Sequence, residues 1–255
     1  MEILDAPRRE SGSRYRCRLR HGSRIVQCFV AEGAKVLAAD WHADALTAAL
    51  ADVGSNAIGM PTNVAEESEC EAMVDRAVSA FGRIDILVNN AGVMDLFSSV
   101  ADMDDATWRR VMGVNLDGPM FAMRRAVPLM LRQGSGAIVN VASVAGLGGG
   151  SAGAAYTASK HGLIGLTKST AYQYAKLGLR CNALAAGGVD THIMQSIDPT
   201  RVDQAALGRL APYHAANPGT LEAVDIASVA LFLASDESRH LNGAIIPVDM
   251  GWRAA

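Results

Sequence analysis

Cysteine is scarce in this sequence and too scattered to form a framework. The four cysteines, Cys17, Cys28, Cys70 and Cys181, show neither CxxC nor any other metal-ligand spacing. This excludes a scaffold held together by disulfides, and it predicts free thiols in a reducing compartment without a metal site.

Long hydrophobic runs are also missing, because no stretch reaches the ~18 apolar residues of a membrane-spanning helix. We therefore expect a cytoplasmic protein that is not inserted in a membrane.

Charged residues are few, at 19% of the chain, and the positive ones are unevenly placed. Seven arginines lie between residues 7 and 24, including every second position of RYRCRLRH (14–21), and that segment carries a charge of +6. The whole chain carries −3, so the remainder carries −9, which disfavours nucleic acid as the main partner. A transit peptide is disfavoured too, because Glu2, Asp5 and Glu10 accompany the arginines.

Apolar residues, in contrast, make up 50% of the chain and form short runs between longer amphipathic stretches. The runs predict strands at 35–40, 84–92, 136–143, 179–187 and 244–251. The stretches predict helices at 44–54, 69–82, 102–134 with a kink or break at Pro119, 154–178 and 221–236. Continuous apolar strands alternating with helices favour a parallel sheet covered on both faces. The predicted fold is an α/β, doubly wound parallel sheet of the Rossmann type, a single domain over residues 25–255 preceded by an atypical Arg-rich segment at 1–24.

Tyr156 and Lys160 lie four residues apart on the predicted helix 154–178, so their side chains share one face. An ammonium beside a phenol favours the phenolate and is expected to lower the pKa of Tyr156, which suits a general acid/base. Ser143, at the end of the preceding strand, is placed to donate a hydrogen bond to a substrate carbonyl. Taken alone, a tyrosine and a lysine at this spacing are more often an ordinary amphipathic pair.

Other motifs accompany that pair. From about residue 25 to 252 the chain resembles the short-chain dehydrogenase/reductase family in NNAG (89–92), Asn115, Ser143, YTASK (156–160) and NALAAGGVDT (182–191), which occur in the family's order and spacing. The resemblance implies that Tyr156 exchanges a proton with the reacting oxygen and that Ser143 positions the carbonyl. It also implies that Lys160 lowers the pKa of Tyr156 and holds the nicotinamide ribose, while Asn115 supports a water in the proton relay.

The resemblance further implies a nicotinamide cofactor at the carboxyl ends of the strands. Asp40 follows a strand and is placed to accept hydrogen bonds from the adenosine ribose, and its charge repels a 2′-phosphate, so NAD is expected over NADP. The alternative is that Asp40 caps the next helix. The other expected cofactor-binding residues are Gly22, Asn63, Val64, Asn89, Ala91, Gly92, Tyr156, Lys160, Gly187, Val189 and Thr191. Asn63 and Ala186 depart from the aspartate and proline usual in the family.

The family's glycine-rich phosphate-binding loop is missing from its place. A valine-rich strand and TGxxxGxG should precede IVQCFVAEGAKV (25–36), since backbone N–H groups and a helix N-terminus hold the pyrophosphate there. RYRCRLRH cannot be that strand, because buried guanidinium groups would cost on the order of several kcal/mol each.

A shift of reading frame accounts for the missing loop. Gly22 lies 11 residues before Gly33, the spacing expected for the loop's last glycine. With permitted codons, RYRCRLRHG (14–22) read one base forward becomes GTGAASGMG, which contains TGxxxGxG. GC-rich glycine and alanine codons become arginine codons when misread, so the shift also explains the arginine density. We therefore favour a compensated frameshift, in the gene or its sequencing record, over a functional basic arm.

The predicted function is NAD(P)-dependent interconversion of a secondary alcohol and a ketone by hydride transfer, on a small-molecule substrate. The alternative is a non-catalytic Rossmann-like binding or scaffold protein whose cofactor binding is impaired by residues 7–24. The resemblance also implies a homotetramer, formed through the helices around 102–130 and 154–178 and the C-terminus.

Overall fold

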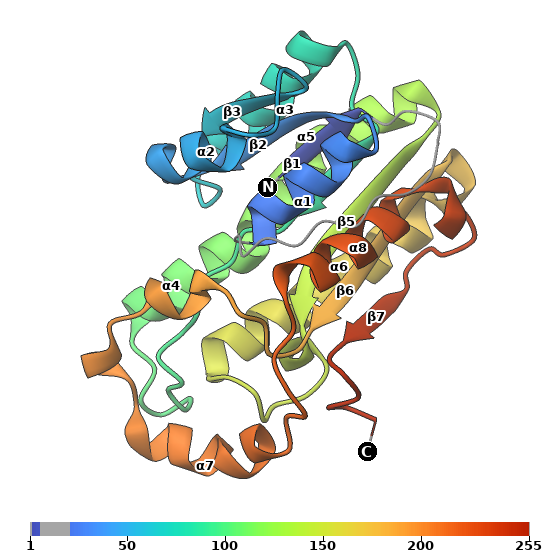
Figure 1. Ribbon diagram of the computed structural model, residues 1–255. Coiled ribbons are helices and arrows are strands. Elements are labelled where there is room, and N and C mark those ends of the chain that lie inside the picture. Colours follow the sequence, from blue (N-terminus) through green and yellow to red (C-terminus); the bar gives the residue numbers. More distant parts are fainter. Residues whose placement is uncertain (1, 6–20, 255) are drawn as a thin grey trace.

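A seven-stranded sheet in the order β3-β2-β1-β4-β5-β6-β7 forms the centre of the protein (Figure 1). The computed structural model of the chain describes residues 2–5 and 21–254. The strands are β1 (Glu2–Asp5), β2 (Lys35–Asp40), β3 (Ala57–Pro61), β4 (Ile86–Asn89), β5 (Gly136–Ser143), β6 (Leu179–Ala186) and β7 (Ile245–Val248). The helices are α1 (His21–Ala31), α2 (Ala43–Leu50), α3 (Glu67–Phe81), α4 (Asp105–Met112), α5 (Gly118–Gln133), α6 (Ala154–Tyr174), α7 (Gln204–Ala215) and α8 (Ala223–Ala234). All five predicted strands are present, whereas the sequence did not indicate β1, β3, α1 or α7.

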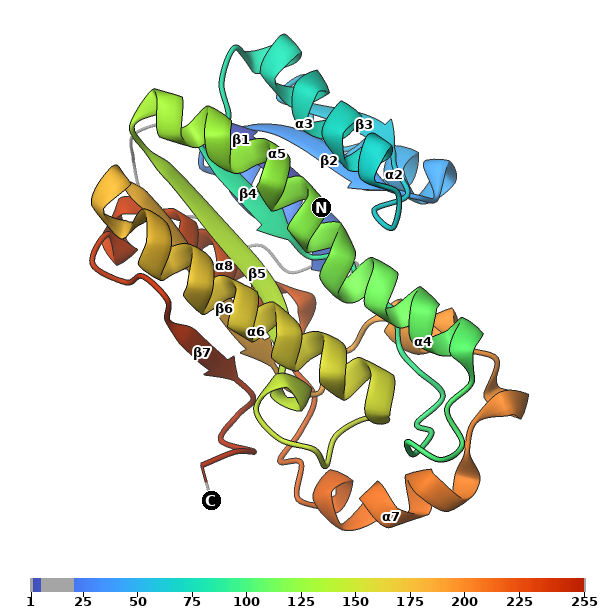
Figure 2. The same ribbon diagram turned by 180° about the vertical axis from the view of Figure 1, so that it is seen from behind.

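Helices cover both faces of the sheet. Comparison of Figure 1 with Figure 2 shows α1 and α8 on one face and α3, α5 and α6 on the other. On the first face, Phe29 of α1 belongs to the same apolar core as Leu233 of α8. On the second, Met73 of α3 belongs to the same core as Met130 of α5. The doubly wound arrangement is therefore confirmed.

The central strand β1 runs in the opposite direction to its neighbours. It pairs antiparallel with both β2 and β4, with Glu2 opposite Ala38 and Val88. The other strand pairs of the sheet are parallel, so the expectation of a wholly parallel sheet is corrected at β1. The space between β2 and β4 has to be filled, because the facing edges of two strands would otherwise leave backbone N–H and C=O groups unpaired. The segment EILD fills it in place of the valine-rich strand that the sequence lacks.

The direction of β1 separates its end from the start of α1. Asp5 pairs with Lys35 at the amino-terminal end of β2. α1 runs toward that same end, because Gly33, with φ 83°, turns the chain from α1 into β2. α1 therefore starts near the carboxyl edge of the sheet, whereas β1 ends at the opposite edge.

The segment RYRCRLRH and the frameshift hypothesis for residues 7–24 fall largely outside the described residues. Of residues 7–24, the structure describes 21–24, and they form the first turn of α1. Gly22 is the second residue of this helix, and its expected role in binding the cofactor stays a prediction.

The predicted helix 102–134 consists of three elements. α4 is followed by a π-helical turn (Gly113–Asp117), and α5 begins at Gly118 with Pro119 in its first turn. Proline has no backbone N–H to donate, and the change from π-helical to α-helical hydrogen bonding falls directly before Pro119. The predicted break is thus confirmed. Isolated π-helical turns occur frequently at functional sites, and this one carries Asn115.

Candidate active site

The chain passes from the carboxyl end of β5 into α6 through a short helical turn and a loop. Ser143 is the last residue of β5, and Tyr156 and Lys160 occupy the first two turns of α6. Tyr156 is 7% exposed and Lys160 is 3% exposed. Ser143 lies near enough to the phenol to lower the pKa of Tyr156, and Lys160 Nζ lies 5.5 Å from the centroid of the Tyr156 ring. The two side chains share a face of the helix, as the sequence predicted.

Asn115 and Gly92 complete this cluster from the side of β4. Asn115 Oδ1 accepts a hydrogen bond from the Val93 N–H at 2.9 Å, and Nδ2 donates to the Val93 carbonyl at 3.0 Å and to Ser159 Oγ at 3.2 Å. A Cβ atom placed on Gly92 would lie 3.5 Å from Asn115 Oδ1 and 3.6 Å from Lys160 Nζ. The four residues expected to be catalytic therefore converge beside Gly92. The Asn115 side chain braces the loop after β4, and its support of a water stays a prediction.

Comparison with known proteins agrees with this geometry. Residues 22–253 match a family model described as Enoyl-(Acyl carrier protein) reductase. The chain is 43% identical over 231 residues to short chain dehydrogenase adrF of Penicillium rubens, covering 88% of this chain and 89% of that protein. It is 42% identical over 240 residues to 3beta-hydroxysteroid dehydrogenase 2 of Eggerthella lenta, covering 91% and 90%. The chain belongs to the short-chain dehydrogenase/reductase family.

A solved structure shows the same fold. The crystal structure of levodione reductase matches with a TM-score of 0.84 at 32% identity, covering 92% of this chain and 94% of that one. As a short-chain dehydrogenase/reductase, the protein is an oxidoreductase. The family generally uses NAD(P) and acts on small molecules.

Burial dominates the protonation equilibria in this short-chain dehydrogenase/reductase site. It raises the pKa of Tyr156 to about 12, while the hydrogen bond from Ser143 opposes the rise and the negative charge of Asp95 adds to it. Burial also lowers the pKa of Lys160 to about 8. The expected lowering of the tyrosine pKa is therefore corrected. The Lys160 ammonium donates to the Val141 carbonyl at 3.0 Å, and desolvation of the phenol is the stronger effect.

The residues expected at the adenosine end lie together after β2 and β3. The Asp40 carbonyl accepts from the Thr62 N–H at 2.9 Å, and Asp40 Oδ1 accepts from the His42 N–H at 2.9 Å. The N-cap residue of α2 is His42, so the alternative that Asp40 is this cap is wrong. Asn63 Oδ1 accepts a backbone hydrogen bond within the turn after β3, and Val64 is buried.

The expected cofactor-binding residues Gly187, Val189 and Thr191 lie after β6 in a segment rich in polar residues, 187–204, which we call the lid. A Cβ atom on Gly187 would lie 2.9 Å from Asp249 Cα, so the close approach of these backbones requires glycine. Val189 pairs with Leu221 through an isolated bridge, and Thr191 caps a short helix, His192–Ser196. The lid is therefore partly helical, and α7 follows it.

The residues after β4 show where a cofactor fits. Asn89 Nδ2 donates to Asn140 Oδ1 at 2.7 Å and thereby joins β4 to β5, and Ala91 is half-buried. The buried Oδ1 atoms of Asn89 and Asn90 have no hydrogen-bond partner among the described residues. Unpaired buried acceptors indicate a ligand or water at this point. With the close approaches at Gly92 and Gly187, they fit NAD(P), while the residues that precede α1 and would hold its pyrophosphate lie outside the described ranges.

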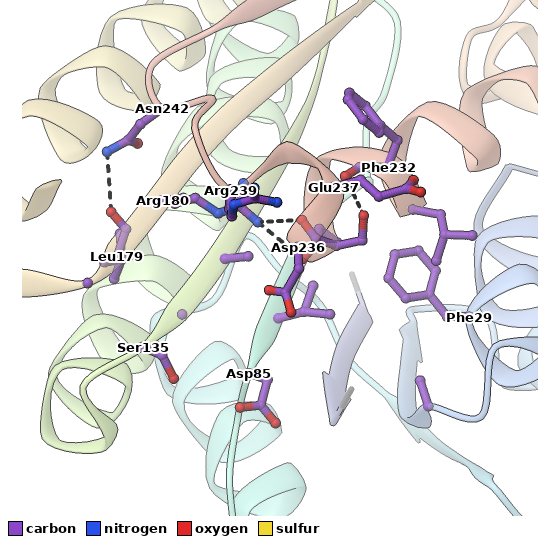
Figure 3. Close-up of a pocket in the computed structure, with 18 of the residues that line it drawn as sticks. Phe29, Asp85, Ser135, Leu179, Arg180, Phe232, Asp236, Glu237, Arg239 and Asn242 are labelled. Atoms are coloured by element: carbon purple, nitrogen blue, oxygen red, sulfur yellow. Dashed lines mark hydrogen bonds between the residues drawn. The ribbon is translucent and has the colours of Figure 1, made fainter. Parts of the chain in front are cut away.

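A cavity of about 1470 Å³ lies at the opposite edge of the sheet (Figure 3). Its lining includes Asp85 before β4, Gly136 of β5 and Leu179 of β6, together with Phe29 and Phe232. These strands begin at this edge, whereas ligands of doubly wound sheets bind where the strands end. None of the expected site residues lines this cavity, so it is separate from the candidate active site.

Two further findings concern residues 2–5 and 21–254. This part of the chain contains no group of three or more His, Cys, Asp or Glu residues that could hold a metal ion. It also contains no helix that is long and apolar enough to cross a membrane. Cys70 and Cys181 are buried free thiols, and Cys17 lies outside the described residues.

Proposed function

We propose that the protein interconverts an apolar secondary alcohol and the matching ketone, with NAD as cofactor and Tyr156 as the general acid/base. The observation that supports this most directly is the convergence of Ser143, Tyr156 and Lys160 at the carboxyl edge of the sheet, beside Gly92. When NAD is bound, its nicotinamide would supply or accept the hydride.

The protonation of the site suits ketone reduction without further change. With a pKa raised to about 12, the Tyr156 phenol carries its proton at neutral pH and can donate it to the substrate oxygen. Ser143 lies beside the phenol and orients the same oxygen. In the oxidative direction Tyr156 has to lose its proton first, and a charged Lys160 next to the ring favours that loss.

The side chains around Tyr156 favour an apolar substrate. Tyr156 shares a core cluster with buried Met94, Phe97, Val111, Ala145, Ala152 and Ala155, and half-buried Ile193, Leu207 and Leu210 pack against it. These residues come from the loop after β4, α4, the segment between β5 and α6, the start of α6, the lid and α7. An apolar ring or chain is stabilised by such a lining at about 25 cal/mol per Å² buried.

NAD is proposed over NADP because Asp40 ends β2 with a carboxylate at the expected ribose position. Replacing Asp40 with alanine should raise the ratio of kcat/KM for NADP to that for NAD by about tenfold or more. The control is Asp44→Asn, which removes an exposed carboxylate from α2. An unchanged ratio in Asp40→Ala contradicts the proposed role. A homotetramer and a cytoplasmic location stay predictions.

The proposed role of Tyr156 is tested by Tyr156→Phe, assayed on a panel of cyclic and linear secondary alcohols with NAD. Loss of the hydroxyl should lower kcat by about 10²–10⁴-fold, with NADH binding retained. The control is Tyr172→Phe, on the same helix, since Tyr172 is 89% exposed. Turnover by Tyr156→Phe at the wild-type rate would refute the proposal, as would activity confined to enoyl thioesters.

Cofactor binding is tested separately by titration with NADH, followed by fluorescence. The chain is compared with a variant in which residues 14–22 read GTGAASGMG, the sequence of the shifted frame. We expect the variant to bind NADH more tightly, because a glycine-rich turn offers backbone N–H groups to the pyrophosphate. Equal and tight binding by both proteins contradicts the hypothesis that residues 7–24 impair the cofactor site.

A further inference from the structure

Asp95 is a buried carboxylate in the middle of the apolar loop VMDLF (93–97), and the sequence analysis assigned it no role. It is 0% exposed. The nearby Arg110 guanidinium donates to the backbone carbonyls of Met94 and Ser196. The hydrogen bonds that Asp95 accepts come instead from three backbone N–H groups.

Two of those N–H groups belong to the start of α6. Asp95 Oδ1 accepts from the Gly153 N–H at 3.2 Å, and Oδ2 accepts from the N–H of Tyr156 itself at 2.9 Å. Gly153 is the N-cap residue of α6 and offers no side-chain cap. The first N–H groups of a helix need acceptors, and a negative charge is favoured there by the helix dipole. Asp95, which lies 58 positions before Gly153, therefore supplies the side-chain cap that α6 lacks.

The third N–H group holds the loop in an unfavourable conformation. Phe97 has φ 60°, in the left-handed region, and its N–H donates to Asp95 Oδ1 at 3.0 Å. A Cβ atom on Gly153 would lie 2.6 Å from Asp95 Oδ2 and 2.7 Å from the Phe97 carbonyl carbon. The loop and the start of α6 are thus in direct contact through Asp95. Non-glycine residues in this conformation persist where the surroundings hold them, often at functional sites.

We propose that Asp95 is a positioning residue for Tyr156, which fixes the catalytic end of α6 against the substrate-facing loop and places a negative charge beside the phenol. This rests on the proposed role of Tyr156. Asp95 has no contact with substrate in the proposal and acts through the backbone of α6.

The charge gives the proposal a signature that a purely structural role lacks. Asp95 is one of the groups that raise the pKa of Tyr156, whereas the pKa of Lys160 is set by burial. Lys160 lies beside the Tyr156 ring on the same helix, and Arg110 on α4 interacts electrostatically with Asp95. Removing the carboxylate charge should therefore make the phenol easier to deprotonate, since a nearby like charge disfavours the phenolate.

The test is Asp95→Asn in the full chain, assayed for alcohol oxidation with NAD between pH 6 and pH 11. Asparagine retains one acceptor oxygen and removes the charge. We expect kcat to fall at least tenfold. We also expect the apparent pKa of the rise of kcat/KM with pH to fall by about 0.5–1 pH unit. Hydrogen–deuterium exchange of the peptide spanning residues 150–160 should become faster. If Asp95→Asn does not fold, Asp95→Ser supports the same measurements.

The matched control is Asp225→Asn, which removes a carboxylate from the capping box of α8. It should leave both the pH profile and the exchange of residues 150–160 unchanged. An unmoved pH profile with wild-type exchange in Asp95→Asn overturns the proposal, even if kcat falls. Wild-type activity of Tyr156→Phe overturns the proposed function instead, and the exchange measurement then still decides whether Asp95 holds α6.

Discussion

Replacing Lys160 with methionine should make the cofactor-free protein more stable at neutral pH while abolishing its activity. Lys160 is 3% exposed, and burial lowers its pKa from 10.5 to about 8. At 1.36 kcal/mol per pH unit, keeping this side chain charged in the folded protein costs about 3 kcal/mol. Methionine has a similar shape and avoids that cost, but it gives up the hydrogen bond to the Val141 carbonyl, worth about 1 kcal/mol. The variant should therefore be more stable by about 2 kcal/mol at pH 7.

The pH dependence follows from linkage. Below pH 8 the amine is charged in both the folded and the unfolded states, so the cost is fully present. Between pH 8 and pH 10.5 the unfolded state binds more protons, and the stability contribution of Lys160 rises with pH. Above pH 10.5 the amine is neutral in both states and the cost disappears. The advantage of Lys160→Met should thus shrink by about 3 kcal/mol from pH 7 to pH 10.5 and change sign.

The assay is urea unfolding of both proteins at each pH and equal concentration, followed by tryptophan fluorescence. Burial raises the pKa of Cys70 to about 11 and of Cys181 to about 12, so both thiols lower the stability at high pH. They affect wild type and variant alike, and the difference between the two proteins isolates Lys160. The control is Lys168→Met, because Lys168 is exposed on the same helix and should give no pH-dependent difference. A Lys160→Met difference that stays constant from pH 7 to pH 10.5 would refute the reasoning.

Three other perturbations test separate parts of the structure. Arg180→Met should lower the free energy of unfolding by about 2–3 kcal/mol. The Arg180 guanidinium donates to carbonyls at the end of α8, including those of Leu233 and Ala234. A melting temperature within 2 °C of wild type would contradict this prediction. Ser196→Ala should raise KM about tenfold with little change in kcat, because Ser196 Oγ accepts from the Met94 N–H at 2.9 Å and so joins the lid to the loop after β4. A lower kcat with an unchanged KM would count against that role, and Ser169→Ala on α6 is the control. Cys181, fully buried with a raised pKa, should react with iodoacetamide at pH 8 only after unfolding, as peptide mass spectrometry will show, and labelling of the native protein within minutes would disprove its burial.

The local features of the site were predictable because they depend on short spacings. Tyr156 and Lys160 share a face since they lie four residues apart on a helix. The predicted helix ends at Gly82 and Gly178 are confirmed by left-handed φ values of 83° and 82°, which glycine adopts without strain. Asn115 was identified as a residue of a helical region, but a sequence gives no sign that its turn is π-helical.

The features that were missed depend on contacts between distant residues. Asp95 reaches Tyr156 across 61 positions, and its only sequence signal is one acid in an apolar loop. The net pKa of Tyr156 was not predictable from the Lys160 spacing, because a spacing says nothing about how far burial disfavours the phenolate.

The sequence by itself determined the family, the doubly wound fold and the side chains that meet beside Gly92, because these follow from apolar periodicity and from motifs at fixed spacing. Tertiary structure decided the direction of β1, the acceptor that caps α6 and the protonation of Tyr156 and Lys160. A four-residue strand pairs in either direction, so the neighbouring strands choose its orientation. Desolvation and capping by Asp95 exist only once distant segments are packed together, and for that reason they cannot be read from the chain alone.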